Sequence, residues 1–146
     1  MATTPLPAPS DARILAFLLC DSAIQDKRSS KWTLVGLFNV LHAKRFPAVH
    51  PRLTFFLKLA FASPPGPFGF DVALVRLGSQ PGLAESEVGR IVVRAEPTEP
   101  STNFETAVEV PGLAFPALGD YEFRLSVGSA AATHPVTVAP DMGEAS

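Results

Sequence analysis

The chain has 146 residues, 14 acidic against 12 basic, and a formal net charge of −2. This length fits one domain, since domains cluster at roughly 100–150 residues. The nearly balanced charge gives no overall field for nucleic acid or an anionic membrane, so we expect neither as a partner. Charged residues are only 18% of the chain, while 47% are hydrophobic; ordinary domains carry roughly 25% charged residues. This imbalance indicates that part of the surface is covered.

Cys20 is the only cysteine, so an intramolecular disulfide is excluded. It lies in an apolar run, where a free cysteine behaves as a small hydrophobic residue. We therefore expect a cytoplasmic location. The apolar run Ile14–Cys20 is too short and lacks the flanking residues of a signal peptide. No stretch approaches the ~20 apolar residues of a membrane-spanning helix.

The folded domain is predicted to span residues 13–138. Residues 1–12 contain three prolines and no aromatic residue, and residues 139–146 are of similar character. We predict both ends as flexible tails, because neither can bury enough apolar surface to order itself.

The first two predicted strands are residues 13–21 and 32–41, the second of which can extend to residue 43. Both are apolar at odd and even positions, so each requires cover on two faces. Periodicity alone does not distinguish the first from a short helix, but the β-branched and aromatic residues of the second favour an antiparallel hairpin. Gly36 is interpreted as space for Phe38 or Trp32 rather than as a bulge.

The rest of the chain continues in the same manner. Clear two-residue alternation begins in the third predicted strand, and proline- and glycine-rich turns separate the segments. The further predicted strands are residues 52–61, 68–77, 90–94, 103–110, 121–127 and 133–138. The sequence predicts an all-β fold, a two-sheet antiparallel β-sandwich of about 7–8 strands with immunoglobulin-like or Greek-key topology.

A local motif supports this class. Gly119 precedes the only tyrosine, Tyr121, at the entry to a strand. In Greek-key sandwiches a tyrosine at this place forms a corner, in which its hydroxyl bonds a backbone group a few residues upstream. We predict a structural tyrosine corner at Gly119 and Tyr121.

Several short motifs resemble a family of small bacterial proteins of unknown function with a β-sandwich fold. They are Leu-Leu-Cys-Asp21, Leu34-Val-Gly-Leu-Phe38, Phe46-Pro-Ala-Val-His-Pro51 and Gly119-Asp-Tyr-Glu-Phe-Arg-Leu125. The resemblance covers most of residues 13–138 and implies a cytoplasmic bacterial protein. It implies no catalytic residue. The last motif also resembles the end of immunoglobulin-like and fibronectin-like domains, which bears on the fold alone.

No combination of residues predicts catalysis, a metal site or a cofactor. The histidines and the single cysteine lack zinc-type spacing, and no Gly-x-Ser-x-Gly motif is present. The carboxylate pairs Glu85/Glu87 and Glu105/Glu109 are interpreted as solvated faces. The basic residues near positions 27–31 and 44–52 are interpreted as solvated loop charges rather than a nucleic-acid site. We expect a protein that is not an enzyme and that needs no cofactor.

The expected function is protein interaction through the outer face of the first hairpin. If Ile14, Ala16, Leu18 and Cys20 pack the core, the opposite face forms an exposed apolar patch. The candidate interface residues are Leu15, Phe17, Leu19, Val35, Leu37 and Phe56. The expected partner is a protein, either a second copy in a homodimer or another chain.

Two alternatives stay open. Within one chain, the loops at residues 44–51 or 78–89, or a tail, cover the hairpin face. In a different functional class, the sandwich binds a small ligand or a carbohydrate, which requires a concave face with exposed aromatic residues.

Overall fold

The computed structural model describes residues 11–49, 53–78, 85–110 and 113–141, which form strands and no helix. The apolar alternation of the sequence accounts for the main strands, because each presents one row of side chains to a shared core. The strands are β1 (Arg13–Gln25), β2 (Trp32–Leu37), β3 (Val40–Ala43), β4 (Ala48–Val49), β5 (Thr54–Ala60), β6 (Phe68–Arg76), β7 (Ser86–Ala95), β8 (Asn103–Glu109), β9 (Ala114–Phe115), β10 (Gly119–Val127) and β11 (Ala130–Pro140).

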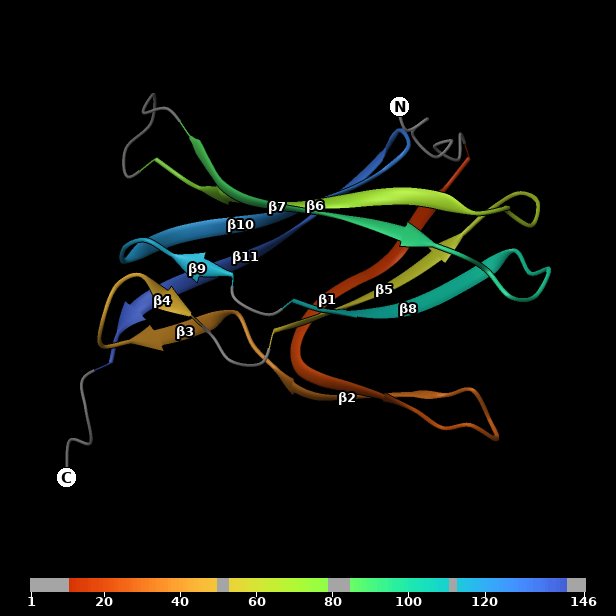
Figure 1. Cartoon of the computed structure of the whole chain (residues 1–146), viewed down its shortest axis with the longest axis horizontal. Helices are drawn as coiled ribbons and strands as arrows, with labels where there is room; N and C mark the ends of the chain where they lie inside the picture. Colours follow the sequence, from red (N-terminus) through yellow and green to blue (C-terminus); the bar gives the residue numbers. More distant parts are fainter. Residues whose placement is uncertain (1–10, 50–52, 79–84, 111–112, 142–146) are drawn as a thin grey trace, which may run out of the picture.

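Two sheets face each other (Figure 1). Sheet A has the strand order β2-β1-β5-β8, and sheet B has the order β3-β11-β10-β6-β7. A small third sheet pairs β4 with β9. All pairings are antiparallel except that of β3 with β11, which is parallel. The prediction of an all-β, two-sheet sandwich is confirmed, with more strands than expected.

The topology is immunoglobulin-like. If β1, β5, β6, β8, β10 and β11 are taken as strands A, B, C, E, F and G of that fold, sheet A contains the neighbours A-B-E and sheet B contains G-F-C. This is the arrangement of the central strands in immunoglobulin domains. The added element is β2, which pairs with β1 at the edge of sheet A.

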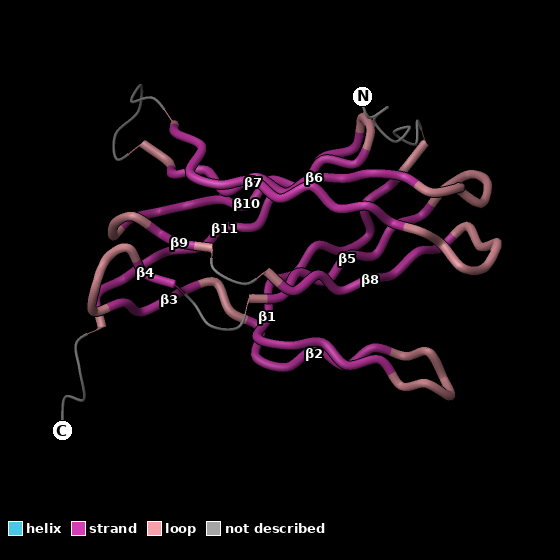
Figure 2. Tube along the Cα trace, viewed as in Figure 1, coloured by secondary structure: helices cyan, strands magenta, loops and turns pink. Residues whose placement is uncertain are grey.

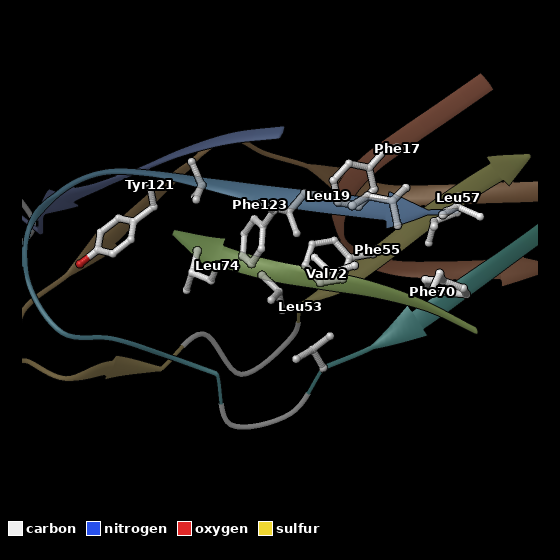
Figure 3. Close-up of a cluster of buried hydrophobic side chains, with 14 of the residues drawn as sticks. Phe17, Leu19, Leu53, Phe55, Leu57, Phe70, Val72, Leu74, Tyr121 and Phe123 are labelled. Atoms are coloured by element: carbon white, nitrogen blue, oxygen red, sulfur yellow. The ribbon is translucent and has the colours of Figure 1, made fainter. Parts of the chain in front are cut away.

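The core lies between the sheets and is rich in aromatic residues (Figure 3). Phe55 on β5 is central to it, because its ring lies 5.5 Å from that of Phe17 in the same sheet and 4.7 Å from that of Phe123 in sheet B. Leu19, Leu57, Leu59, Leu74, Leu125, Val127 and Tyr121 are also fully buried here. Aromatic edge-to-face contacts add to the energy of burying this area.

Several predicted boundaries were wrong. β1 continues four residues beyond the predicted strand, to Gln25. The second predicted strand is divided between two sheets, because the chain crosses from β2 to β3 at Phe38 and Asn39. β7 begins at Ser86, within a predicted loop of which residues 79–84 lie outside the described residues. β11 extends to Pro140, two residues into the predicted tail; residues 1–10 and 142–146 lie outside the described residues.

Candidate interaction surface

The β1–β2 hairpin projects from sheet A as an arm, residues 21–37 (Figure 2). Its turn is closed by backbone hydrogen bonds from Asp26 to Lys31, at 2.9 Å, and from Ser30 to Asp26, at 2.8 Å. The Asp26 carboxylate also accepts a bond from the Arg28 backbone N–H at 2.9 Å. That bond, followed by one from the Ser29 side chain, lowers the pKa of Asp26. The side chain of Asp26 thus organises the turn.

The arm covers the outer face of sheet A. Thr54 and Phe56 point away from the core by alternation with Phe55, yet they are only 2% and 6% exposed. The Trp32 ring of the arm packs on Phe56, with the ring centroids 5.5 Å apart. The Thr54 hydroxyl donates a hydrogen bond to the backbone oxygen of Asp21 at 3.1 Å. The chain therefore covers part of this face itself with the arm; of the predicted covering segments, residues 50–51 and 79–84 and most of both tails lie outside the described residues.

Phe17 and Leu19 do not lie on an outward face. They belong to the core between the sheets and are 7% and 0% exposed. The predicted orientation of the first strand was therefore wrong for residues 16–20, whereas Ile14 packs against the core as predicted. Residues that alternate with Phe17 and Leu19, such as Cys20, face the arm side. A register shift between Ile14 and Ala16 displaces the alternation early in β1. Continuous apolar runs carry no signal for which face is inward.

The other candidate interface residues are separated by the fold. Phe56 is buried under Trp32. Leu15 is exposed but lies near the start of β1, away from the arm. Only Val35 and Leu37, on the arm, are both exposed and close together, two residues apart in β2.

A third arm residue, Ile24, joins Val35 and Leu37. The β1–β2 register pairs Ser22 with Val35, and Ile24 with Thr33, so Ile24 shares the face of Val35 and lies diagonal to it. We call these three residues the apolar stripe. Ile24 was missed because it was assigned to the polar connection, although continued alternation into the turn would have been its signal.

Gly36 marks an irregularity in β2, contrary to the interpretation as space for an aromatic ring. Its φ is +70°, which favours glycine. An added Cβ would collide with the Asp21 side chain across the hairpin. The close approach of Asp21 therefore explains the glycine.

A cleft of about 350 Å³ opens between the arm, the turn after β5 and the β7–β8 connection. Both aromatic and carboxylate side chains line it. The indole nitrogen of one lining residue, Trp32, is buried and finds no hydrogen-bond partner among the residues that the structure describes. The lining residues are Gln25, Ser30, Trp32, Pro65, Glu96, Pro97, Thr98, Glu99, Ser101, Asn103, Phe104 and Glu105. Sequence reasoning missed this cleft, because its walls come from distant segments.

The hydrogen bonds predicted for the tyrosine corner are present. The Tyr121 hydroxyl donates to the backbone oxygen of Ala117 at 2.6 Å and accepts from its N–H at 3.1 Å. Gly119 has a φ of +136°, which favours glycine at this turn. The motif ties the turn before β10 to the core.

The predicted solvated carboxylates Glu85 and Glu87 are engaged in ion pairs. Glu85 lies 2.7 Å from Arg124, and Glu87 lies 2.6 Å from Arg90. A side-chain hydrogen bond from Arg90 lowers the pKa of Glu87. Arg90 also reaches Asp71 at 3.1 Å, so it links β7 to β6. These ion pairs lie on the outer surface of sheet B.

Other titratable groups show no reactive arrangement. Burial, followed by the nearby Asp21 charge, raises the pKa of the Cys20 thiol, which disfavours the reactive thiolate. Nδ1 of His42 and of His134 lie 3.5 and 2.9 Å from backbone oxygens, while His50 falls outside the described residues. In the described ranges no group of three or more acidic, histidine or cysteine residues could hold a metal. The same residues include no helix able to span a membrane.

Comparison with known proteins places this architecture in a family but not in a pathway. No curated protein matches the chain. One family model, described as a family of unknown function, matches residues 15–139, from β1 to the end of β11. The match includes the arm, the cleft and the tyrosine corner. The chain therefore belongs to DUF6941, a family of unknown function.

Proposed function

We propose that the protein is a non-catalytic interaction module that associates with a second copy of itself through the hairpin arm. The observation that carries the proposal is the apolar stripe, in which Ile24, Val35 and Leu37 are 58%, 45% and 60% exposed. Contiguous exposed apolar side chains often mark interaction surfaces. A bacterial, cytoplasmic setting without a cofactor is part of the proposal, and the sequence resemblance and the single cysteine support it.

The free edge of β2 favours a second copy as the partner. Among the described strands β2 pairs only with β1, and it contains no charged residue. Charges on an edge strand oppose pairing with another strand. The edge strand β3 is only four residues long. The remaining edges of the two sheets, β7 and β8, contain Glu87, Arg90, Arg94, Glu105 and Glu109.

The energy available is that of a weak dimer. Fully burying one aliphatic side chain contributes about 1.5–3 kcal/mol, and each stripe residue is about half exposed. The stripes of two copies would together contribute roughly 6 kcal/mol, to which backbone hydrogen bonds between two β2 strands would add. Association itself costs an estimated 4–15 kcal/mol. We therefore expect dissociation in the micromolar range or above.

Light scattering of the full chain, over concentrations up to about 0.5 mM, tests this proposal. We expect the mass to rise toward that of a dimer as concentration rises. The double variant Val35→Glu/Leu37→Glu should remain a monomer while keeping its unfolding midpoint. Val92→Glu is the matched control, because Val92 is 78% exposed and lies on β7; it should associate normally. A monomer at every concentration, or equal loss of association in the control, would refute the proposal.

A further inference from the structure

The cleft beside the arm has the volume of a ligand pocket, and its walls come from segments far apart in the chain. Its volume of about 350 Å³ falls in the range of roughly 300–1,000 Å³ for ligand pockets. It is built where three segments meet, with Ser30 of the arm, Pro65 after β5 and Thr98 before β8 on its walls. The cleft is separate from the apolar stripe, since Ile24, Val35 and Leu37 do not line it.

The lining is negatively charged. Three glutamates, Glu96, Glu99 and Glu105, line the cleft, and no lysine, arginine or histidine does. Glu96 is paired with Arg94 at 2.9 Å. No ion pair within the described residues involves Glu99 or Glu105, although Lys58 lies opposite Glu105 in the sheet. The cleft therefore has two carboxylates, outside the ion pairs of the described residues, to offer a cation.

Two aromatic rings add to the attraction for a cation. Trp32 and Phe104 lie on the cleft walls, and the face of such a ring attracts an ammonium or guanidinium group by about 0.5–2 kcal/mol. Carboxylates together with aromatic rings favour a charged group over a neutral sugar, which would need the rings but not the charges.

Independently of the charges, the indole N–H of Trp32 requires a hydrogen-bond acceptor. It is buried and no described residue accepts its hydrogen bond. An unsatisfied buried donor costs free energy, typically about 1–3 kcal/mol. A ligand with a carbonyl oxygen would relieve this cost if the ring turns to meet it. A peptide supplies such an oxygen at every residue.

We propose that this cleft binds a basic peptide segment. An arginine or lysine side chain lies against Trp32 and Phe104 with its charge toward Glu99 and Glu105, while a peptide carbonyl accepts from the Trp32 N–H. The exposed position of both carboxylates makes the site weak and sensitive to salt.

Titration calorimetry of the full chain at low salt, with the capped peptide Ac-Gly-Arg-Gly-Arg-Gly-NH₂, tests the proposal. We expect saturable binding that weakens at least about tenfold when citrulline replaces both arginines, because citrulline is uncharged. Absence of saturable binding at millimolar peptide, or equal binding of the citrulline peptide, would overturn it.

Variants locate the site. Glu99→Gln/Glu105→Gln should weaken binding about tenfold. Glu109→Gln is the matched control, since Glu109 is also exposed on β8 but does not line the cleft; it should bind within about twofold of the parent. Equal losses in both variants would place any binding elsewhere and refute the proposed site.

Trp32→Phe tests the hydrogen bond separately, because it keeps an aromatic ring against Phe56 and removes the N–H. We expect affinity to fall about fivefold, in a variant whose circular dichroism spectrum matches that of the parent. Unchanged affinity would refute the assigned role of the indole N–H.

Discussion

At the scale of single residues, Tyr121 shows how one side chain ties a turn to the core. It is 0% exposed, and its hydroxyl makes both hydrogen bonds to Ala117. Tyr121→Phe keeps the ring against Phe115 but leaves the Ala117 backbone groups without these partners. We expect the free energy of unfolding to fall by about 1–3 kcal/mol, measured by urea denaturation with an unchanged m-value.

Thr137→Val is the control for Tyr121→Phe. It removes a hydroxyl that donates to the Asp120 carboxylate at 2.9 Å, in a more exposed place. Water can replace that bond, so we expect a loss of at most about 0.5 kcal/mol. If the tyrosine variant loses no more than this control, the corner does not stabilise the fold.

At the scale of elements, the arm depends on the irregularity at Gly36. An alanine there would adopt an unfavourable positive φ and press its Cβ against Asp21. We expect Gly36→Ala to reduce the free energy of unfolding by about 2 kcal/mol or more and to speed amide hydrogen exchange in β2. The faster exchange would report that the arm separates from sheet A.

Gly66→Ala provides the comparison for this element. Gly66 has no positive φ, and an added Cβ there meets no atom within 4 Å. We expect this variant to be neutral or stabilised by up to about 1 kcal/mol, through the lower entropy of the unfolded chain. Equal stability of the two alanine variants would mean that neither the positive φ nor the contact with Asp21 requires glycine at position 36.

At the scale of the whole molecule, both sheets contribute side chains to one core. Leu57 in sheet A and Leu125 in sheet B are each 0% exposed. We expect Leu57→Ala and Leu125→Ala to cost about 2–5 kcal/mol each, since both leave a cavity between the sheets. Leu15→Ala removes the same atoms from a side chain that is 48% exposed and should cost about 1 kcal/mol or less.

Urea unfolding of these three leucine variants, followed by tryptophan fluorescence and circular dichroism, measures the losses. Coincident transitions would show that the sheets unfold together. A loss for Leu15→Ala equal to those of the two buried positions would contradict the assignment of the core. Losses confined to one of the two buried positions would contradict a core shared by both sheets.

Much of the fold could be predicted from the sequence, because alternation and turn residues act locally. The alternating segments became β5, β6, β8 and β10, and one row of side chains from each lies in the core or packs against it. The tyrosine corner could be located for the same reason, since its partners are four residues apart. The orientation of β1 could not be predicted, because the side chains on both of its faces are apolar. Hydrophobicity alone therefore does not show which face is turned toward the core.

The sequence by itself determined the sandwich class and the apolar character of the first hairpin. Only the tertiary structure decided which of these apolar side chains are buried and which are exposed. The curve of β1 places Trp32 on Phe56, so the arm covers one apolar surface and exposes another. The cleft likewise exists only because the arm meets the β7–β8 connection in space. Contacts between segments far apart in the chain leave no local pattern, so a surface built from them emerges only when the sheets have assembled.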